Sequence, residues 1–532
     1  MTLLCSCSAG VVGEPLVEYS TDVVVTGSRS QVLTRQLDAG IYVLEIRERD
    51  IDLRVALDCG ERHSVLADAS TRHGLLRTVV RLGADSRLRL TLDSLDVRGW
   101  KGAAAVRILR WPRTDPEAPD QRLLGFESLG AAHELIAAGT PAEWRAALAP
   151  LREAARHFQA GGDLHSMAEA EYLRGRVERD LLFGFNGETA RLALLHFRAA
   201  ADAVGAQRAA ILLASNELAA AARMGAEVPR SERTALLERA ARRLAQAGAF
   251  FESRDMQSDA LEAVDLDLGR MRLVGRTEVA IATAYEAMRE RARRRADAYF
   301  EVLATRGLAN IALRSGDAAR AAQLFERVIA FVERPRNPGL YARLRGDFGR
   351  ALLALGEFDR ALELHSEAFR LFASRGNDRR AAHELLALAT IQLRTGNPEL
   401  ALDAVEGALP LFQRSQDQPG KAAALRIAGM AAAGMDRHER ALEYLQDAER
   451  LERDRLNLGR TRLLIAGELR ALGDLEEAAA LVARLVPTVE DALLPDAFAE
   501  RARLRLARGR LDAALADLRT ADAGYERLKL DY

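Results

Sequence analysis

The sequence predicts a mainly α-helical fold in which a long repeat solenoid follows a small antiparallel β-sandwich. Between residues 303 and 451 a turn of glycine and a polar residue recurs at a constant interval, at Gly316, Gly356 and Gly396, and Asp436 replaces the glycine in the next copy. Each turn separates two helical segments rich in Ala, Leu and Arg. A helix–turn–helix unit repeated in register is the signature of an α-solenoid. Residues before 112 instead form short β-rich runs.

Length, charge and composition exclude several classes of function. At 532 residues the chain is too long for one ordinary core, so several domains or a repeat array are expected. The formal net charge of −1 gives no overall field that would favour nucleic acid or an anionic membrane. No apolar run approaches the ~20 residues of a membrane span. Lysine occurs only at Lys101, Lys421 and Lys529, which indicates a GC-rich bacterial genome.

Residues 1–13 resemble the end of a bacterial lipoprotein signal, with Cys7 of the run Leu4–Cys7 as the lipidated residue. The apolar stretch ahead of Cys7 is short and lacks a positive start. Either a signal peptide precedes Met1, or the run arose by chance. The first case predicts a lipid-anchored protein of the cell envelope or periplasm, and the second a cytoplasmic protein.

Residues 14–112 are predicted to form the β-sandwich. Short β-rich runs alternate there with glycines, which is typical of antiparallel strands joined by turns. The predicted strands are Asp22–Thr26, Gln31–Leu37, Ile41–Glu48, Leu53–Leu57, Leu75–Leu82, Leu88–Leu92 and Ala104–Leu109.

One part of this region resembles a known family. The run Leu37–Ile46, followed by Asp50–Leu53, is similar to the pre-peptidase C-terminal-like β-sandwich of secreted bacterial proteins. Asp50, Asp52 and Asp58 offer oxygen ligands for Ca²⁺, but their spacing matches no established calcium loop, and a solvated turn is the alternative. The three cysteines of the chain also lack zinc-ligand spacing, so we predict no metal site.

The helical part begins after a proline-rich linker at residues 113–121. Residues 122–250 are predicted to form divergent helical repeats, and residues 251–532 the regular solenoid. The regular units resemble tetratricopeptide repeats in a longer form of about forty residues. That family places a small residue within the first helix, a glycine turn, and alanines in the second helix. Gly349, Gly356, Ala361 and Ala368 fit this pattern fully. Other matching positions are Ala309, Ala321, Ala389, Ala401, Ala408, Gly429, Ala441, Ala448, Ala466, Ala478, Ala502, Ala514 and Ala521.

The resemblance implies a non-catalytic scaffold that binds a peptide or partner protein in the concave groove of the solenoid. Projection of the first helices places Arg306, Asn310, Arg343, Arg350, Arg426, Arg460, Arg470 and Arg503 toward that groove. Arg306 and Asn310 resemble part of the carboxylate clamp of chaperone-binding repeats, so an acidic ligand is one hypothesis. The alternative is that these arginines are solvated or pair with carboxylates at helical spacing.

Other functions were weighed against this one. A β-sandwich ahead of such repeats resembles the N-terminal region of bacterial CHAT proteins, whose caspase-like domain follows the repeats. That resemblance implies a sensor part of a peptidase system whose catalytic domain is absent or lies in another chain. A transcriptional regulator would need a basic helix-turn-helix, and the densest basic run, Arg289–Arg295, is interpreted as a solvated helix end. No phosphate loop, nucleophile elbow or paired-carboxylate motif predicts an enzyme or a cofactor.

Overall fold

The computed structural model describes residues 14–26, 29–49, 51–60, 62–67, 74–83, 86–95, 101–112, 119–181, 187–224, 229–332 and 338–530. Cys7 and Asp50 lie outside these residues. The chain divides into two compact units. The first unit comprises residues 1–308 and 330–337, and the second comprises residues 309–329 and 338–532. The domain boundaries predicted from the sequence stay predictions.

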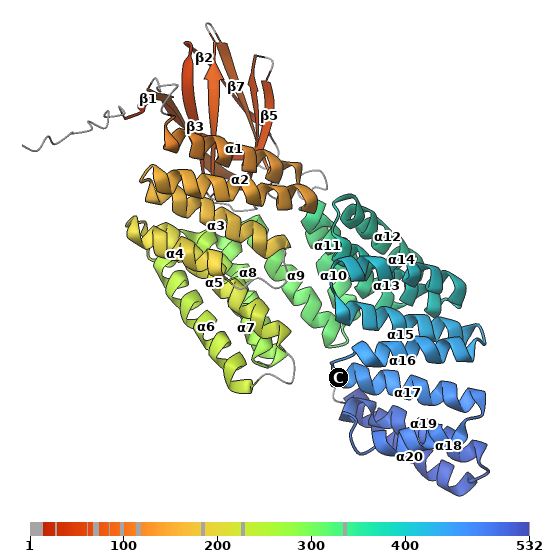
Figure 1. The fold of residues 1–532 in the computed structure, drawn as a ribbon. Helices are drawn as coiled ribbons and strands as arrows, with labels where there is room; N and C mark the ends of the chain where they lie inside the picture. The colour runs from red at the N-terminus through yellow and green to blue at the C-terminus, as the bar shows by residue number, and fades with distance from the viewer. Residues whose placement is uncertain are drawn as a thin grey trace, which may run out of the picture. The chain divides into compact units, whose positions relative to one another are not determined.

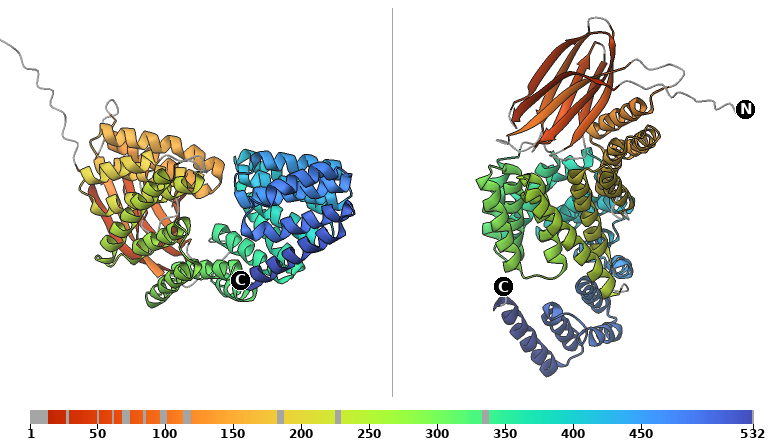
Figure 2. Two further views of the ribbon diagram at one scale, coloured as in Figure 1. Left: turned by 90° about the horizontal axis from the view of Figure 1, so that it is seen from below. Right: turned by 90° about the vertical axis from the view of Figure 1, so that its left-hand side faces the viewer.

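The first unit begins with a sandwich of two four-stranded antiparallel sheets (Figures 1 and 2). The strand order is β1-β8-β3-β6 in one sheet and β2-β7-β4-β5 in the other. The strands are β1 (Leu16–Thr26), β2 (Gln31–Leu37), β3 (Gly40–Arg49), β4 (Leu53–Cys59), β5 (Arg62–Ala67), β6 (Leu75–Leu82), β7 (Ser86–Ser94) and β8 (Lys101–Trp111). These strands overlap all seven predicted runs and add β5. In β5 only Val65, Leu66 and Ala67 are apolar, so the run lacks the alternation that marks a strand.

Strand β3 is buried on both faces along most of its length, which explains why its apolar residues alternate only partly. Tyr42, Leu44 and Ile46 pack between the two sheets. Val43, on the opposite face of the same strand, packs in a second cluster with the side chains of the first helices, including Phe126. Side chains of a strand point alternately to opposite faces, so a strand covered on both sides is apolar throughout.

Helices follow the sandwich in the first unit. Their bounds are α1 (Gln121–Ala138), α2 (Pro141–Ala160), α3 (Leu164–Leu181), α4 (Glu188–Ala199), α5 (Ala203–Arg223), α6 (Arg230–Glu252), α7 (Gln257–Leu273), α8 (Glu278–Arg294) and α9 (Ala298–Arg314). The boundary between the two units falls within α9. Thr140 caps α2, whose first residue is Pro141, through a reciprocal capping box with Glu143. None of the described helices is both long enough and apolar enough to cross a bilayer.

The second unit is a stack of antiparallel helix pairs, which confirms the predicted solenoid fold (Figure 1). Its helices are α10 (Ala318–Ile329), α11 (Pro338–Leu355), α12 (Phe358–Ser374), α13 (Asp378–Arg394), α14 (Pro398–Arg414), α15 (Gln418–Gly434), α16 (His438–Leu451), α17 (Arg455–Leu472), α18 (Leu475–Leu485), α19 (Leu494–Ala507) and α20 (Leu511–Leu530). The turn between α11 and α12 holds Gly356 at φ +80°, and Asp436 adopts φ +57° at the equivalent turn. Glycine adopts this left-handed conformation freely, and aspartate tolerates it better than most residues.

Only some of the glycines inside first helices lie where two helices approach closely. A Cβ on Gly429 of α15 would lie 2.6 Å from Leu445 and 3.2 Å from the backbone oxygen of Ala441, both in α16. A Cβ on Gly467 of α17 would meet no atom within 4 Å. The first glycine is therefore required by packing, whereas the second is not.

We predict opposite effects for alanine at these two positions. Gly429→Ala should lower the free energy of unfolding by about 1–3 kcal/mol, because the backbone of α16 would have to move. Gly467→Ala should raise it by up to about 1 kcal/mol through helix propensity. Urea unfolding followed by circular dichroism measures both. Equal stability of the two variants would contradict the close-approach role of Gly429.

Candidate functional site

The second unit presents one continuous surface formed by the first helix of each pair, here called the first-helix face (helices α11, α13, α15, α17 and α19). Each of these helices contacts its own second helix and also the next first helix along the chain. Among the described residues, no two second helices are in comparable contact. Because elements on the inside of a curved array lie closest together, the first-helix face is the inner, concave one.

A buried carboxylate lies under an exposed guanidinium in α11. Asp347 is 7% exposed and forms an ion pair with Arg350, whose side chain is 51% exposed. Asn310 connects to both residues: it donates to Asp347 at 3.4 Å and accepts from Arg350 at 3.2 Å. The arginine is therefore held in one orientation while much of its charged group still faces solvent.

The same arrangement recurs in α19. Glu500 is 5% exposed and accepts hydrogen bonds from Arg470 and Arg503, each at 2.8 Å. Asp347 and Glu500 each stand nine residues before a turn glycine, and Arg350 and Arg503 each stand six before it. The acid–arginine pair therefore occupies equivalent repeat positions in α11 and α19, whereas the three first helices between them carry no such pair at these positions. In α19 the carboxylate of Glu500 pairs with two arginines, so these three side chains together carry a net positive charge.

The remaining predicted residues have different surroundings. Arg426 pairs with the buried Glu452 at 3.5 Å, Arg343 donates to the backbone oxygen of Gly339 at 3.4 Å, and Arg460 is exposed. Arg306 belongs to the first unit, whereas the other seven predicted residues belong to the second. The predicted partner-binding role of all eight stays a prediction.

A further cluster on this face was missed by the sequence analysis. Asp417 caps α15 by accepting from the backbone N–H of Gly420 at 2.9 Å, and it also contacts Arg379 at 2.8 Å and His383 at 3.0 Å. Burial alone would raise the pKa of Asp417, but the hydrogen bonds from His383 and Arg379 outweigh it and hold the pKa well below its usual range. Its position in the repeat could have indicated that His383 lies on this face, because His383 stands thirteen residues before a turn glycine, as Arg343 does.

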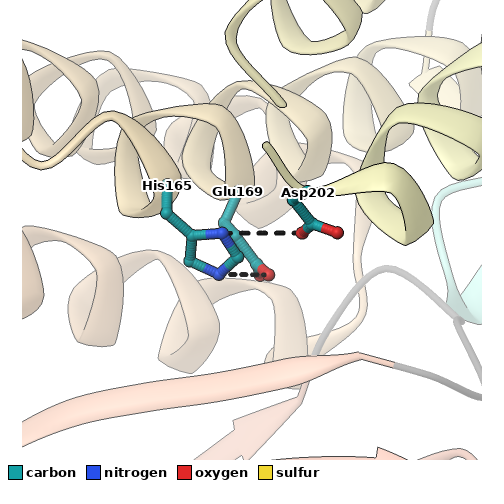
Figure 3. A group of neighbouring side chains, drawn as sticks. All are labelled: His165, Glu169 and Asp202. Atoms are coloured by element: carbon teal, nitrogen blue, oxygen red, sulfur yellow. Dashed lines mark ion pairs between the residues drawn. The ribbon is translucent and has the colours of Figure 1, made fainter. Parts of the chain in front are cut away.

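The first unit contains a second candidate site. A cavity of about 480 Å³ is lined by residues from β3, β6, α1, α3 and the α4–α5 turn, among them His133, Glu169 and Asp202. At its border His165 lies between Glu169, at 3.4 Å, and Asp202, at 3.5 Å (Figure 3). These three side chains are the described residues that could hold a metal ion.

Electrostatic interactions favour the ionised forms of His165 and Glu169. The hydrogen bond with Glu169 raises the pKa of His165. Burial opposes ionisation of Glu169, but His165 and the charge of Arg77 outweigh it and lower the pKa of Glu169 to about 2. The sequence analysis missed the cluster, although His165 and Glu169 are spaced one helical turn apart.

We predict that Asp417→Asn lowers the stability of the second unit in a pH-dependent way. Asparagine keeps the helix cap but loses the ion pair, which should lower the free energy of unfolding by about 1–3 kcal/mol at pH 7. The depressed pKa of Asp417 stabilises the fold above its unfolded pKa near 4, and this contribution is lost as the pH falls. The difference between wild type and variant should therefore shrink below about pH 4.

Urea unfolding at neutral and acidic pH measures this effect. Asp378→Asn is the matched control, because Asp378 forms a more exposed pair with Arg414 and should change stability by less than about 1 kcal/mol. An Asp417→Asn effect no larger than that of the control, or one independent of pH, would contradict the prediction.

The family comparison agrees with the helical repeats of the second unit. Residues 379–451 match the tetratricopeptide repeat family model. The solved structure of apo RapI covers 68% of this chain and 98% of its own, at 11% identity and a TM-score of 0.47. BtubC (BKLC) from P. vanneervenii covers 38% and 87%, at 22% identity and a TM-score of 0.35.

The apo form of the quorum sensor NprR from B. thuringiensis covers 53% of this chain and 94% of its own, at 14% identity and a TM-score of 0.39. No curated protein matches the sequence. The resemblance to CHAT proteins stays a prediction. The predicted resemblance to tetratricopeptide repeats is confirmed for residues 379–451.

Proposed function

We propose that this chain is a non-catalytic protein-interaction scaffold that binds an extended peptide or a partner protein along the first-helix face. The observation that carries the proposal is the repeated pair of a buried carboxylate and an exposed arginine, Asp347–Arg350 and Glu500–Arg503. An unpaired arginine on a surface samples many rotamers, and ordering it on binding opposes affinity. Here the buried acid has already ordered the guanidinium.

The chemistry of the face favours an acidic partner. A guanidinium has five N–H donors, and one carboxylate partner uses only part of them. Arg503 is 60% exposed, so its remaining donors are available to a carboxylate of a bound peptide. Glu500 pairs with both Arg470 and Arg503, so these three side chains carry a net positive charge. This charge attracts an acidic peptide within about one Debye length of the surface. A partner with spaced Asp and Glu residues would fit this pattern.

The curved stack suits an elongated partner rather than a small molecule. Successive first helices contact one another directly, so ordered groups recur along the array instead of converging on one point. A peptide laid along such a face gains one contact from each repeat that it crosses. The affinity should therefore rise with the number of repeats that the peptide spans.

The test uses the full chain and a fluorescent peptide library with fixed acidic positions, together with the same library carrying Gln and Asn at those positions. Fluorescence anisotropy should show binding of acidic peptides only. The double variant Arg350→Gln and Arg503→Gln should weaken it about tenfold or more, which corresponds to ~1.4 kcal/mol. Raising the salt concentration should weaken it as well, because the contacts are ionic.

Arg450→Gln is the matched control. Arg450 forms an i,i+3 pair with Asp447, as Arg350 does with Asp347, but it lies on the second helix α16. This variant should bind peptides within about twofold of the wild type. Equal losses in the double variant and the control would point to a general charge effect and contradict the proposed face. Equal binding of acidic and neutral peptides would contradict the acidic partner.

A further inference from the structure

The cavity of the first unit combines apolar walls with inward polar groups. Leu75, Leu129, Leu173, Phe197 and Met256 supply the apolar part of the lining. Charged residues line it on two sides: Arg47, Glu48 and Arg49 come from β3, and His133, Glu169, Asp202, Arg208 and Asp255 come from the helical part. Sites that bind small ligands are typically concave, mostly apolar and equipped with a few oriented polar groups.

Three ligand groups converge at the border of this cavity. His165 and Glu169 lie one turn apart on the same face of α3. Asp202 is fixed as the N-cap of α5 by accepting from the backbone N–H of Gly205 at 2.9 Å. One ligand atom from each of the three side chains lies within 4.8 Å of the others (Figure 3). Around a tetrahedral ion with bonds of about 2.1 Å, ligand atoms are separated by roughly 3.4 Å. Glu169 now contacts Nε2 of His165 and Asp202 contacts Nδ1, so the imidazole ring would turn to bring one nitrogen beside both carboxylates.

This grouping differs from the other histidine–carboxylate contacts of the described chain. His196 pairs with Glu171 at 2.6 Å, His365 with Glu384 at 2.7 Å, and His438 with Glu468 at 2.8 Å. None of these pairs belongs to a set of three metal-ligating groups among the residues that the structure describes.

His133 gives an independent indication of a ligand in this cavity. Its side chain is completely buried and lines the same cavity as Glu169 and Asp202. Its Nδ1 contacts the backbone oxygen of Ala67 at 3.0 Å, while its Nε2 makes no hydrogen bond. Burial lowers the pKa of His133 to about 4, although the hydrogen bond to the backbone of Ala67 and, less strongly, the backbone at Leu75 oppose this shift.

The protonation state of His133 defines what its free nitrogen can do. A neutral imidazole that donates through Nδ1 to a carbonyl presents Nε2 as an acceptor. A buried acceptor without a partner destabilises the fold unless a bound group supplies the missing donor. A water molecule or hydroxyl group on a bound ion is a donor of that kind.

We propose that His165, Glu169 and Asp202 bind a divalent transition-metal ion of the Zn²⁺ type at the border of this cavity, with His133 accepting a hydrogen bond from a metal-bound water. Imidazole nitrogen favours Zn²⁺ over Mg²⁺ and Ca²⁺, which prefer oxygen ligands throughout. Three protein ligands leave one position of a tetrahedral ion open. The ion would bridge α3 and the start of α5, and its open position would be accessible to a small ligand. This site is independent of the peptide-binding function proposed for the second unit.

The experiment is isothermal titration of the chelator-treated full chain with ZnCl₂, with Co²⁺ as a spectroscopic probe of coordination. Wild type should bind one equivalent, and Glu169→Gln and Asp202→Asn should each bind it at least about tenfold more weakly. Both substitutions conserve side-chain shape, and asparagine preserves the cap of α5. Circular dichroism of each variant verifies folding.

His438→Gln is the matched control, because it removes a histidine–carboxylate pair without a third ligand group. It should bind the same single equivalent as the wild type, and Co²⁺ bound to both should give the visible absorption of a four-coordinate ion. Failure of the wild type to bind either ion would overturn the proposal. Equal binding by the wild type and the Glu169→Gln and Asp202→Asn variants would overturn it too, because the ion would then be held by other residues.

Discussion

The close approach of neighbouring helices at small residues is the constraint on which the second unit depends. The alanine five residues after each turn is fully buried in successive repeats, at Ala321, Ala361, Ala401 and Ala441. A larger side chain at such a position would push two helices apart and change the rotation between repeats. Because each repeat contacts mainly its neighbours, this local spacing determines the curvature of the whole array. The position of every charged group on the first-helix face follows from it.

In the first unit, a buried ion pair helps to determine how the helices pack on the sheet. Glu45 of β3 and Arg77 of β6 pair at 2.7 Å on the helix-covered face of the sheet, and Arg77 also donates to Ser166 of α3 at 3.1 Å. A buried ion pair adds little net stability, but each partner left alone would be strongly unfavourable. The pair therefore favours one position of α3 on the sheet. That position also determines where His165 and Glu169, on the same helix, lie beside the cavity.

The fold was predictable because its signals are local and repeated. The turn at Gly356 and the buried Ala361 lie within one repeat, so their spacing alone indicates a helix pair. β5 was missed because its burial comes from pairing with the preceding strand β4 and from contact with α1, neither of which leaves a pattern in its own sequence. In such short strands, tertiary contacts outweigh the β propensity of the individual residues.

The candidate sites were less predictable, for a related reason. Projection of the helices placed arginines such as Arg350 on one face but could not identify the carboxylates beneath them. The His165 cluster also needs Asp202, which reaches it only through the turn between α4 and α5. Contacts of this kind depend on how the helices pack against one another. They follow no simple periodic pattern in the sequence.

Burial of the acids makes a nearly neutral chain compatible with the acidic partner that we propose. The formal net charge is −1, which taken alone argues against any strong preference for anions. Net charge counts a buried carboxylate and an exposed guanidinium equally, whereas a partner meets only the groups that reach the surface. Asp347 and Glu500 are hidden while Arg350 and Arg503 remain exposed. The acid cancels part of the long-range field but leaves the outward N–H donors in place. In the proposed function, the acidic partner would be recognised at short range by these hydrogen-bond donors, although the overall charge of the chain would not attract anions from a distance.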